Sequence, residues 1–411
     1  MSLTKFSLGL HPHHLRSYAI NPELQFRDRC PDQRYNSTFR VVGFPYGLVM
    51  KVALVHDYLT QKGGAERVFE MLCRRYPDAD IFTSLYEPEA SIDFGDREVF
   101  TTYLQQIPKA SRYFKLLAPL YYSAFRALDL RDYDLIISST TSFAKGVRKR
   151  PDAKHICFCH NITRFLWDTK TYLREYTAYR RFLPILEQVF RAMRKADFAY
   201  AQEPDVYIAN SHTVARRIQQ IYHKPAQVIN CPIDSQQFAF SNQKEDFYLA
   251  SARLVSYKRL DVVVEAFNWL GWNLVVTGDG PEREILEARA MKNVKFLGHV
   301  SDAERKQLLS KSKSVIVMAL EDYGLVPIEA NASGTPVIAY GEGGVLDTQI
   351  PGITGVFFNA QTPQALHRAL LKAKAIEWNY QKIRDHAMTK FSEDTFFHSL
   401  ENVIADVCGT G

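Results

Sequence analysis

The sequence predicts an α/β protein built from two doubly wound parallel sheets that face a central cleft. Short apolar strands alternate with longer amphipathic helices, the strands are uninterrupted runs rich in Val and Ile, and 411 residues are too many for one ordinary core. This alternation implies parallel strands joined by right-handed crossovers, and ligands of such sheets bind at the carboxyl ends of the strands. The cleft between two sheets is therefore the expected site.

The predicted strands have the unalternating composition of strands covered on both faces. They are 52–58, 134–140, 155–160, 206–211, 246–254, 273–280, 294–300, 314–320 and 335–341. The predicted helices are 65–75, 213–222, 259–269, 281–291, 302–311 and 363–375. Because the stretch 229–245 lacks periodicity, we place a linker there. We expect a weakly ordered extension over 1–49, Rossmann-like domains over 50–235 and 236–390, and a C-terminal helix over 391–411 that packs back on the first domain.

Composition narrows the class of protein. A net charge of +6 is too mild for a nucleic-acid-binding protein, although it permits attraction to anionic substrates or lipid head groups. The six scattered cysteines fit a reducing cytosol better than a disulfide framework. No apolar run reaches the ~20 residues that span a bilayer, and the polar first 49 residues make a poor signal peptide. We therefore expect a cytoplasmic location.

Two glutamates flank a predicted short helix in "EDYGLVPIEANASG". Pro327 suits the first turn of this helix and Gly334 its C-terminal cap. The helix N-terminus can hold a phosphate through the amides of Gly324, Leu325 and Val326. Glu321 and Glu329 would repel that phosphate, so they need neutral hydrogen-bond donors such as sugar hydroxyls. The alternative is that Glu321 caps the helix and Glu329 faces solvent.

Two cations follow the strand that precedes this region. Arg253 and Lys258 in "ARLVSYKRLD" can neutralise a diphosphate, the first as a bidentate fork and the second as a point charge. An Arg and a Lys five residues apart are otherwise usually surface residues. The turn "TGDGPER", with Gly278 and Asp279, lacks the third glycine of a dinucleotide fingerprint, but it fits a turn that lines a shared cleft.

These motifs together resemble the donor-binding half of the retaining glycosyltransferase family 4, which has the GT-B fold of two Rossmann-like domains. The matching marks are Arg253 and Lys258, "GDGPE" (278–282), "NVKFLGHV" (293–300), and the E-x7-E element followed by "SGTPVIAYGEGG". The resemblance implies that Arg253 and Lys258 bind the donor diphosphate, that Glu321 contacts the transferred sugar, and that Glu329 contacts the ribose. It adds further donor-binding residues, namely Gly278, Asp279, Gly298, Val300, Tyr323, Gly324, Leu325 and Val326.

The N-terminal half carries matching loops. "HDYLTQKGGAERVFE" resembles the family's first loop, in which Gly63 and Gly64 lie beside the donor phosphates and His56 and Asp57 near the acceptor; a plain tight turn is the alternative. "CHNITRFLWD" resembles a stretch of polysaccharide mannosyltransferases and implies that His160 faces the donor sugar, with Arg164 on the acceptor side. In "SSTTSFAKGV", the resemblance places Lys145 near the acceptor, with Gly146 beside it.

The resemblance also implies the chemistry. We expect retention of anomeric configuration, with His160, Arg253, Lys258 and Glu321 as the catalytic set, and neither a metal nor another cofactor. The sequence has no Asp-x-Asp triplet near a strand end to hold Mg²⁺. Cys157, Cys159 and His160 are rejected as a zinc site because no second ligand cluster follows them.

The predicted function is transfer of a hexose, with mannose favoured, from a nucleoside-diphosphate sugar such as GDP-mannose to a glycan or lipid-linked acceptor in cell-surface polysaccharide synthesis. The basic, aromatic segments 108–130 and 172–197 fit either peripheral attachment to an anionic membrane or helices packed on the sheet. The alternatives are a nucleotide-sugar epimerase, a phosphorylase, or a nucleotide-sugar-binding module without catalysis.

Overall fold

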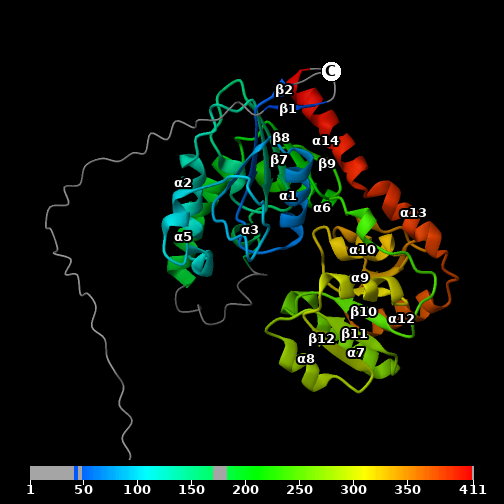
Figure 1. The fold of residues 1–411 in the computed structure, drawn as a ribbon. Helices are drawn as coiled ribbons and strands as arrows, with labels where there is room; N and C mark the ends of the chain where they lie inside the picture. The colour runs from blue at the N-terminus through cyan, green and yellow to red at the C-terminus, as the bar shows by residue number, and fades with distance from the viewer. Residues whose placement is uncertain (1–40, 45–48, 170–182, 410–411) are drawn as a thin grey trace, which may run out of the picture. The chain divides into compact units, whose positions relative to one another are not determined.

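A computed structural model describes residues 41–44, 49–169 and 183–409. Most of the predicted extension 1–49 and part of the basic segment 172–197 lie outside these ranges. The described residues form two large parallel sheets, each with helices on its faces (Figure 1). Among these residues, no helix combines the length and the apolar character needed to cross a membrane.

The first sheet has seven strands in the order β5-β4-β3-β6-β7-β8-β9. Along the chain they are β3 Val52–His56, β4 Asp80–Thr83, β5 Val99–Thr101, β6 Leu135–Thr140, β7 Lys154–Cys159, β8 Val206–Ala209 and β9 Ala226–Val228. The direction of winding reverses between β3 and β6, where His56 lies opposite Ser139. Such a reversal is the point at which open α/β sheets bind ligands.

The second sheet has six strands in the order β12-β11-β10-β13-β14-β15. They are β10 Tyr248–Ser251, β11 Leu274–Thr277, β12 Val294–Gly298, β13 Val315–Val317, β14 Val337–Tyr340 and β15 Gly355–Phe358. Here the winding reverses between β10 and β13. The loops after these two strands carry the predicted cations and the predicted first glutamate, respectively.

Helices connect the strands and continue beyond the last one. They are α1 Gly64–Arg75, α2 Ala118–Ala127, α3 Arg164–Trp167, α5 Leu183–Tyr200, α6 His212–Tyr222, α7 Leu260–Leu270, α8 Arg283–Arg289, α9 Asp302–Lys311, α10 Leu325–Ala332, α11 Val345–Thr348, α12 Pro363–Lys374, α13 Tyr380–Lys390 and α14 Glu393–Cys408. α14 contacts the first sheet, since the Phe396 ring lies 5.5 Å from that of Phe158.

All nine predicted strands and all six predicted helices are present, with ends shifted by a few residues. The prediction missed β4, β5, β9 and β15, which have only three or four residues each. The expected start of the fold at Met50 needs correction. Strand β1 (Val42–Gly43) pairs with β2 (Val49–Met50), and Phe44 is buried with its ring 5.3 Å from that of Tyr76.

Candidate active site

A cavity of about 340 Å³ lies where loops from both sheets meet. Its walls include His56 and Thr141 from the first switch point, the Gly63–Gly64 loop, and Arg253 from the loop after β10. The structure thus brings together predicted residues that are almost 200 positions apart in the sequence. This cavity is the candidate active site.

Two helix N-termini converge at the edge of the cavity. Gly64 begins α1, and a β-carbon placed on it would lie 3.0 Å from the Leu325 side chain, which begins α10. Glycine therefore lets the two helix starts approach closely. The Glu66 carboxylate caps the Gly63 N–H at 2.9 Å. Because the first N–H groups of a helix have no intrahelical partner and carry partial positive charge, this meeting point favours an anion.

The predicted short helix is confirmed at α10. Gly324 precedes it with φ +87°, Pro327 lies in its first turn, and Gly334 follows it with φ +76°. The Tyr323 side chain, in contrast, is buried and donates its hydroxyl to the Cys231 carbonyl at 2.8 Å. Tyr323 therefore anchors the loop from behind, and the prediction that it binds the donor is corrected for its side chain.

Lys258 and Glu321 meet at the second switch point. The Lys258 Nζ lies 2.5 Å from Glu321 Oε1, so the loop after β10 and the loop after β13 are joined by an ion pair. Burial alone would lower the pKa of Lys258, but the Glu321 carboxylate outweighs it and raises the pKa. Arg253 Nη2 lies 3.2 Å from the Tyr257 hydroxyl and borders the cavity. Two cations, Arg253 and Lys258, therefore lie close to the Glu321 carboxylate at the point where a ligand of this sheet is expected.

The glycine turn after β11 supports the Arg253 loop. A β-carbon on Gly278 would lie 2.0 Å from the Ala252 carbonyl oxygen, and the Leu254 N–H donates to the Asp279 carbonyl at 2.9 Å. The Gly278 N–H in turn donates to the Gly298 carbonyl at 2.7 Å, just before half-buried Val300. These predicted donor residues are thus contiguous with the site, and Gly278 shapes the loop that carries Arg253.

A row of buried polar side chains follows the ends of β3, β6 and β7. The Ser139 hydroxyl lies 3.2 Å from His56 Nδ1 and 2.9 Å from His160 Nε2. Burial lowers the pKa of His56, and it lowers the pKa of His160 to about 3, so both rings are neutral at pH 7. His160 stands at the end of β7 as expected, but it reaches the cavity only through Ser139 and His56.

Asp57 shapes the loop after β6. Its carboxylate accepts hydrogen bonds from four successive backbone N–H groups over 141–144 and from the hydroxyls of Thr140 and Thr141. Burial would raise its pKa, but His56 and these N–H groups lower it. Asp57 also lines the cavity, but the loop uses the hydrogen-bonding capacity of its carboxylate, so its expected acceptor role stays a prediction.

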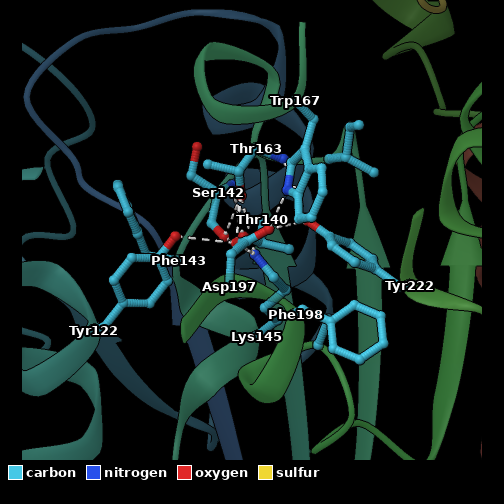
Figure 2. A network of polar contacts seen from close by, with 12 residues as sticks. Tyr122, Thr140, Ser142, Phe143, Lys145, Thr163, Trp167, Asp197, Phe198 and Tyr222 are labelled. Carbon is cyan, nitrogen blue, oxygen red and sulfur yellow. Dashed lines mark hydrogen bonds and ion pairs between the residues drawn. The ribbon is translucent and has the colours of Figure 1, made fainter. Parts of the chain in front are cut away.

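Lys145 is likewise a structural residue. It is buried, and its Nζ lies 2.7 Å from Asp197 Oδ1. Figure 2 shows further donors around the same carboxylate: the hydroxyls of Tyr122, Thr163 and Tyr222 and the indole N–H of Trp167, at 2.6 to 3.1 Å. Lys145 therefore neutralises a buried carboxylate. The expectation that its side chain faces the acceptor, with Gly146 beside it, is corrected.

Arg164 also forms ion pairs within the protein. Its guanidinium lies 2.8 Å from Asp322 and 3.2 Å from Asp168, and Asn161 Nδ2 donates to the same Asp322 carboxylate at 2.5 Å. Arg164 thus joins the segment after β7 to the loop after β13. Its charge is met by these two carboxylates, and its expected contact with the acceptor stays a prediction.

Glu329 departs most from expectation. It is almost completely buried and lies between two guanidinium groups, 2.7 Å from Arg67 and 2.5 Å from Arg305. It neither faces solvent nor offers an open carboxylate to a ribose. Sequence reasoning missed these two arginines, as well as Ser139, Asp197 and Asp322, because the contacts of all five join distant segments. Within the described ranges, no cluster of three or more His, Cys, Asp or Glu side chains is placed to hold a metal ion.

Comparisons with known proteins agree with this geometry. The model for Glycosyltransferase Family 4 matches residues 62–237, and the model for Glycosyl transferases group 1 matches residues 233–390. An uncharacterized glycosyltransferase of Methanocaldococcus jannaschii, MJ1178, is 22% identical over 79% of this chain and 88% of its own. A phosphatidyl-myo-inositol mannosyltransferase of Propionibacterium freudenreichii is 34% identical, over 24% of this chain and 26% of its own.

Among solved structures, Anabaena Alr3699/HepE in complex with UDP superposes with a TM-score of 0.62 at 18% identity, over 87% of this chain and all of that one. The two sheets define the GT-B fold, and the two family models identify the chain as a glycosyltransferase. The chain belongs to glycosyltransferase family 4.

Proposed function

We propose that this glycosyltransferase transfers a hexose, with mannose favoured, from a nucleoside-diphosphate sugar to a glycan or lipid-linked acceptor in cell-surface polysaccharide synthesis, with retention of anomeric configuration. The observation that carries the proposal is the Lys258–Glu321 pair at the second switch point, next to Arg253 and the cavity. A cation for phosphate and a carboxylate for sugar hydroxyls stand side by side, which matches the two chemical ends of such a donor.

In this proposal the diphosphate lies at the meeting point of α1 and α10. Arg253, Lys258 and the helix N–H groups stabilise the negative charge that develops as the nucleoside diphosphate departs. When phosphate approaches Lys258, the Glu321 carboxylate becomes available to accept hydrogen bonds from the transferred sugar. The acceptor hydroxyl passes its proton towards the departing phosphate, and the protein's cations take the part that a metal ion plays elsewhere.

A thermal-shift panel of GDP- and UDP-sugars would identify the donor, because a ligand that binds only the native state raises the melting temperature. The stretch "CHNITRFLWD" and the mannosyltransferase relative favour GDP-mannose. A second structure of Anabaena Alr3699/HepE, in complex with UDP-glucose, favours a UDP-hexose. The proposal expects a rise with one of the two nucleotide classes and slow donor hydrolysis without acceptor. Absence of any shift with both classes would contradict it.

A peripheral site on the cytoplasmic face of an anionic membrane is part of the proposal. Tyr113, Leu116 and Leu120, near the start of α2, are 48%, 72% and 43% exposed. Three exposed cations, Lys109, Arg112 and Lys115, surround these apolar side chains, and the chain has no acidic residue between Glu98 and Asp129. We call these six residues the α2 patch. Exposed apolar side chains among cations are typical of surfaces that dock on anionic leaflets.

Vesicle co-sedimentation at low salt tests the α2 patch. The protein should pellet with vesicles rich in phosphatidylserine and not with neutral phosphatidylcholine vesicles, and Leu116→Glu should weaken pelleting without changing donor binding. Equal behaviour with both lipids, or self-association through the patch in their absence, would refute membrane docking.

A further inference from the structure

Glu329 is held by arginines from two separate segments of the chain. Arg67 belongs to α1, which begins at the cavity, and its Nη1 lies 2.7 Å from Glu329 Oε1. Arg305 belongs to α9, and its Nη1 lies 2.5 Å from Glu329 Oε2. Burial would raise the pKa of Glu329, but Arg305 and Arg67 lower it, so the carboxylate is ionised at pH 7.

The two arginines are not equivalent. Arg305 contacts both oxygens of Glu329, also pairs with Asp302 at 3.0 Å, and its side chain is 16% exposed. The Arg67 side chain is 35% exposed, and among the described residues it makes one polar contact, the bond to Glu329 Oε1. Arg305 alone can neutralise Glu329, so Arg67 can move into solvent without leaving an unpaired buried charge.

The position of Arg67 relates this pair to the donor. Arg67 lies three residues after Gly64, and Glu329 lies four residues after Leu325, while Gly64 and Leu325 touch at the edge of the cavity. Arg67 and Glu329 therefore meet about one turn into each helix from this contact. If the donor phosphates lie at the meeting point of the two helix starts, as proposed, the adjoining ribose is within reach of both helices.

We propose that Arg67 competes with the ribose hydroxyls of the donor for Glu329 Oε1. This inference rests on the proposed function. In the empty enzyme Arg67 occupies the oxygen, and on donor binding a ribose hydroxyl donates to it while Arg67 turns outward. Arg67 is then a specificity-determining residue: it lowers the affinity for ribonucleotides, and it favours release of the nucleoside diphosphate product because it recaptures Glu329.

Calorimetric titration of two ligand pairs into purified enzyme tests this competition. The ligands are GDP and UDP, each compared with its 2′,3′-dideoxy form, which cannot donate to Glu329. Arg67→Met should bind the ribonucleotide about three- to tenfold more tightly, because a competing state is removed. Its affinity for the dideoxy ligand should remain that of the wild type.

Matched variants separate competition from general structural effects. Arg75→Met removes an arginine of the same helix whose partner is Glu401, 2.6 Å away and outside the site, and should change neither affinity. Arg67→Lys retains the cation and should stay near the wild type. Arg67→Met combined with Glu329→Gln should lose the ribose-dependent gain.

Two results would overturn the inference. One is a change of the same size for ribonucleotide and dideoxy ligand in Arg67→Met, which marks a structural effect on the whole site. The other is weaker ribonucleotide binding, which would mean that Arg67 assists the ribose. Failure of the proposed function is distinguishable, because the wild type would then bind neither GDP nor UDP.

Discussion

Two lysine–carboxylate pairs of similar geometry have different surroundings. Lys145 and Asp197, 2.7 Å apart, are 2% and 0% exposed, and four further donors surround the carboxylate. Lys258 and Glu321, 2.5 Å apart, are 16% and 21% exposed at the switch point of the other sheet. The first pair is saturated and holds helices together, while the second keeps capacity for a ligand. Hydrogen-bond saturation therefore separates a structural ion pair from one that can exchange partners.

The largest effect is expected on stability at the saturated pair. Lys145→Met leaves the buried Asp197 charge without its cation, which costs about 3–5 kcal/mol of unfolding free energy. Urea unfolding followed by circular dichroism measures it. Lys258→Met is the matched variant and should lie within about 1 kcal/mol of the wild type, because its partner can still reach solvent. Equal losses in both variants would erase the distinction.

The site variants, which should change stability little, should have large effects on activity. Lys258→Met or Arg253→Ala should lower kcat by roughly 10²- to 10³-fold, the scale for losing one preorganised charge partner of the transition state. The exposed Arg289 of α8 provides a control, Arg289→Ala, that should keep wild-type kcat. Turnover of the donor selected by the thermal-shift panel is the readout. Near-normal kcat in both site variants would remove Lys258 and Arg253 from the mechanism.

Low pH should destabilise the protein through two buried histidines of the first sheet. Burial lowers the pKa of His155 and of His160 from 6.5 to about 3. Below pH 6.5 these histidines bind protons in the unfolded chain but stay neutral in the folded chain. The free energy of unfolding therefore falls progressively from that pH down to about pH 3. Between pH 7 and 5.5 each histidine should cost about 1.3 kcal/mol. His160→Gln should remove its share of this loss, whereas His398→Gln, at an exposed position, should not; identical pH profiles would contradict the assignment.

The smallest effect is expected at an exposed ion pair. Arg75, 47% exposed, lies 2.6 Å from Glu401 of α14. Arg75→Met should cost less than about 1 kcal/mol of unfolding free energy, because solvent screens such pairs. Chemical denaturation suffices to measure it. A loss as large as that of Lys145→Met would show that burial does not set the order of these pairs.

The sequence predicted the architecture well because apolar periodicity and turn residues act locally. It also placed Arg253, Lys258 and Glu321 in one region, since loops that follow strands of one parallel sheet end at the same edge. It did not anticipate the partners of Asp57, Lys145, Arg164 and Glu329. Each is a charged residue near a strand end whose partner is far away in the sequence, so only the folded chain shows whether its charge is already satisfied.

The central claim is that Arg253, Lys258 and the helix starts hold a diphosphate. Calorimetric comparison of GMP with GDP, and of UMP with UDP, tests it most directly. The claim predicts that the second phosphate increases wild-type affinity at least about tenfold for the preferred base, and that this gain disappears in Arg253→Ala combined with Lys258→Met. A gain that survives in the double variant, or one that is absent from the wild type, would contradict the claim.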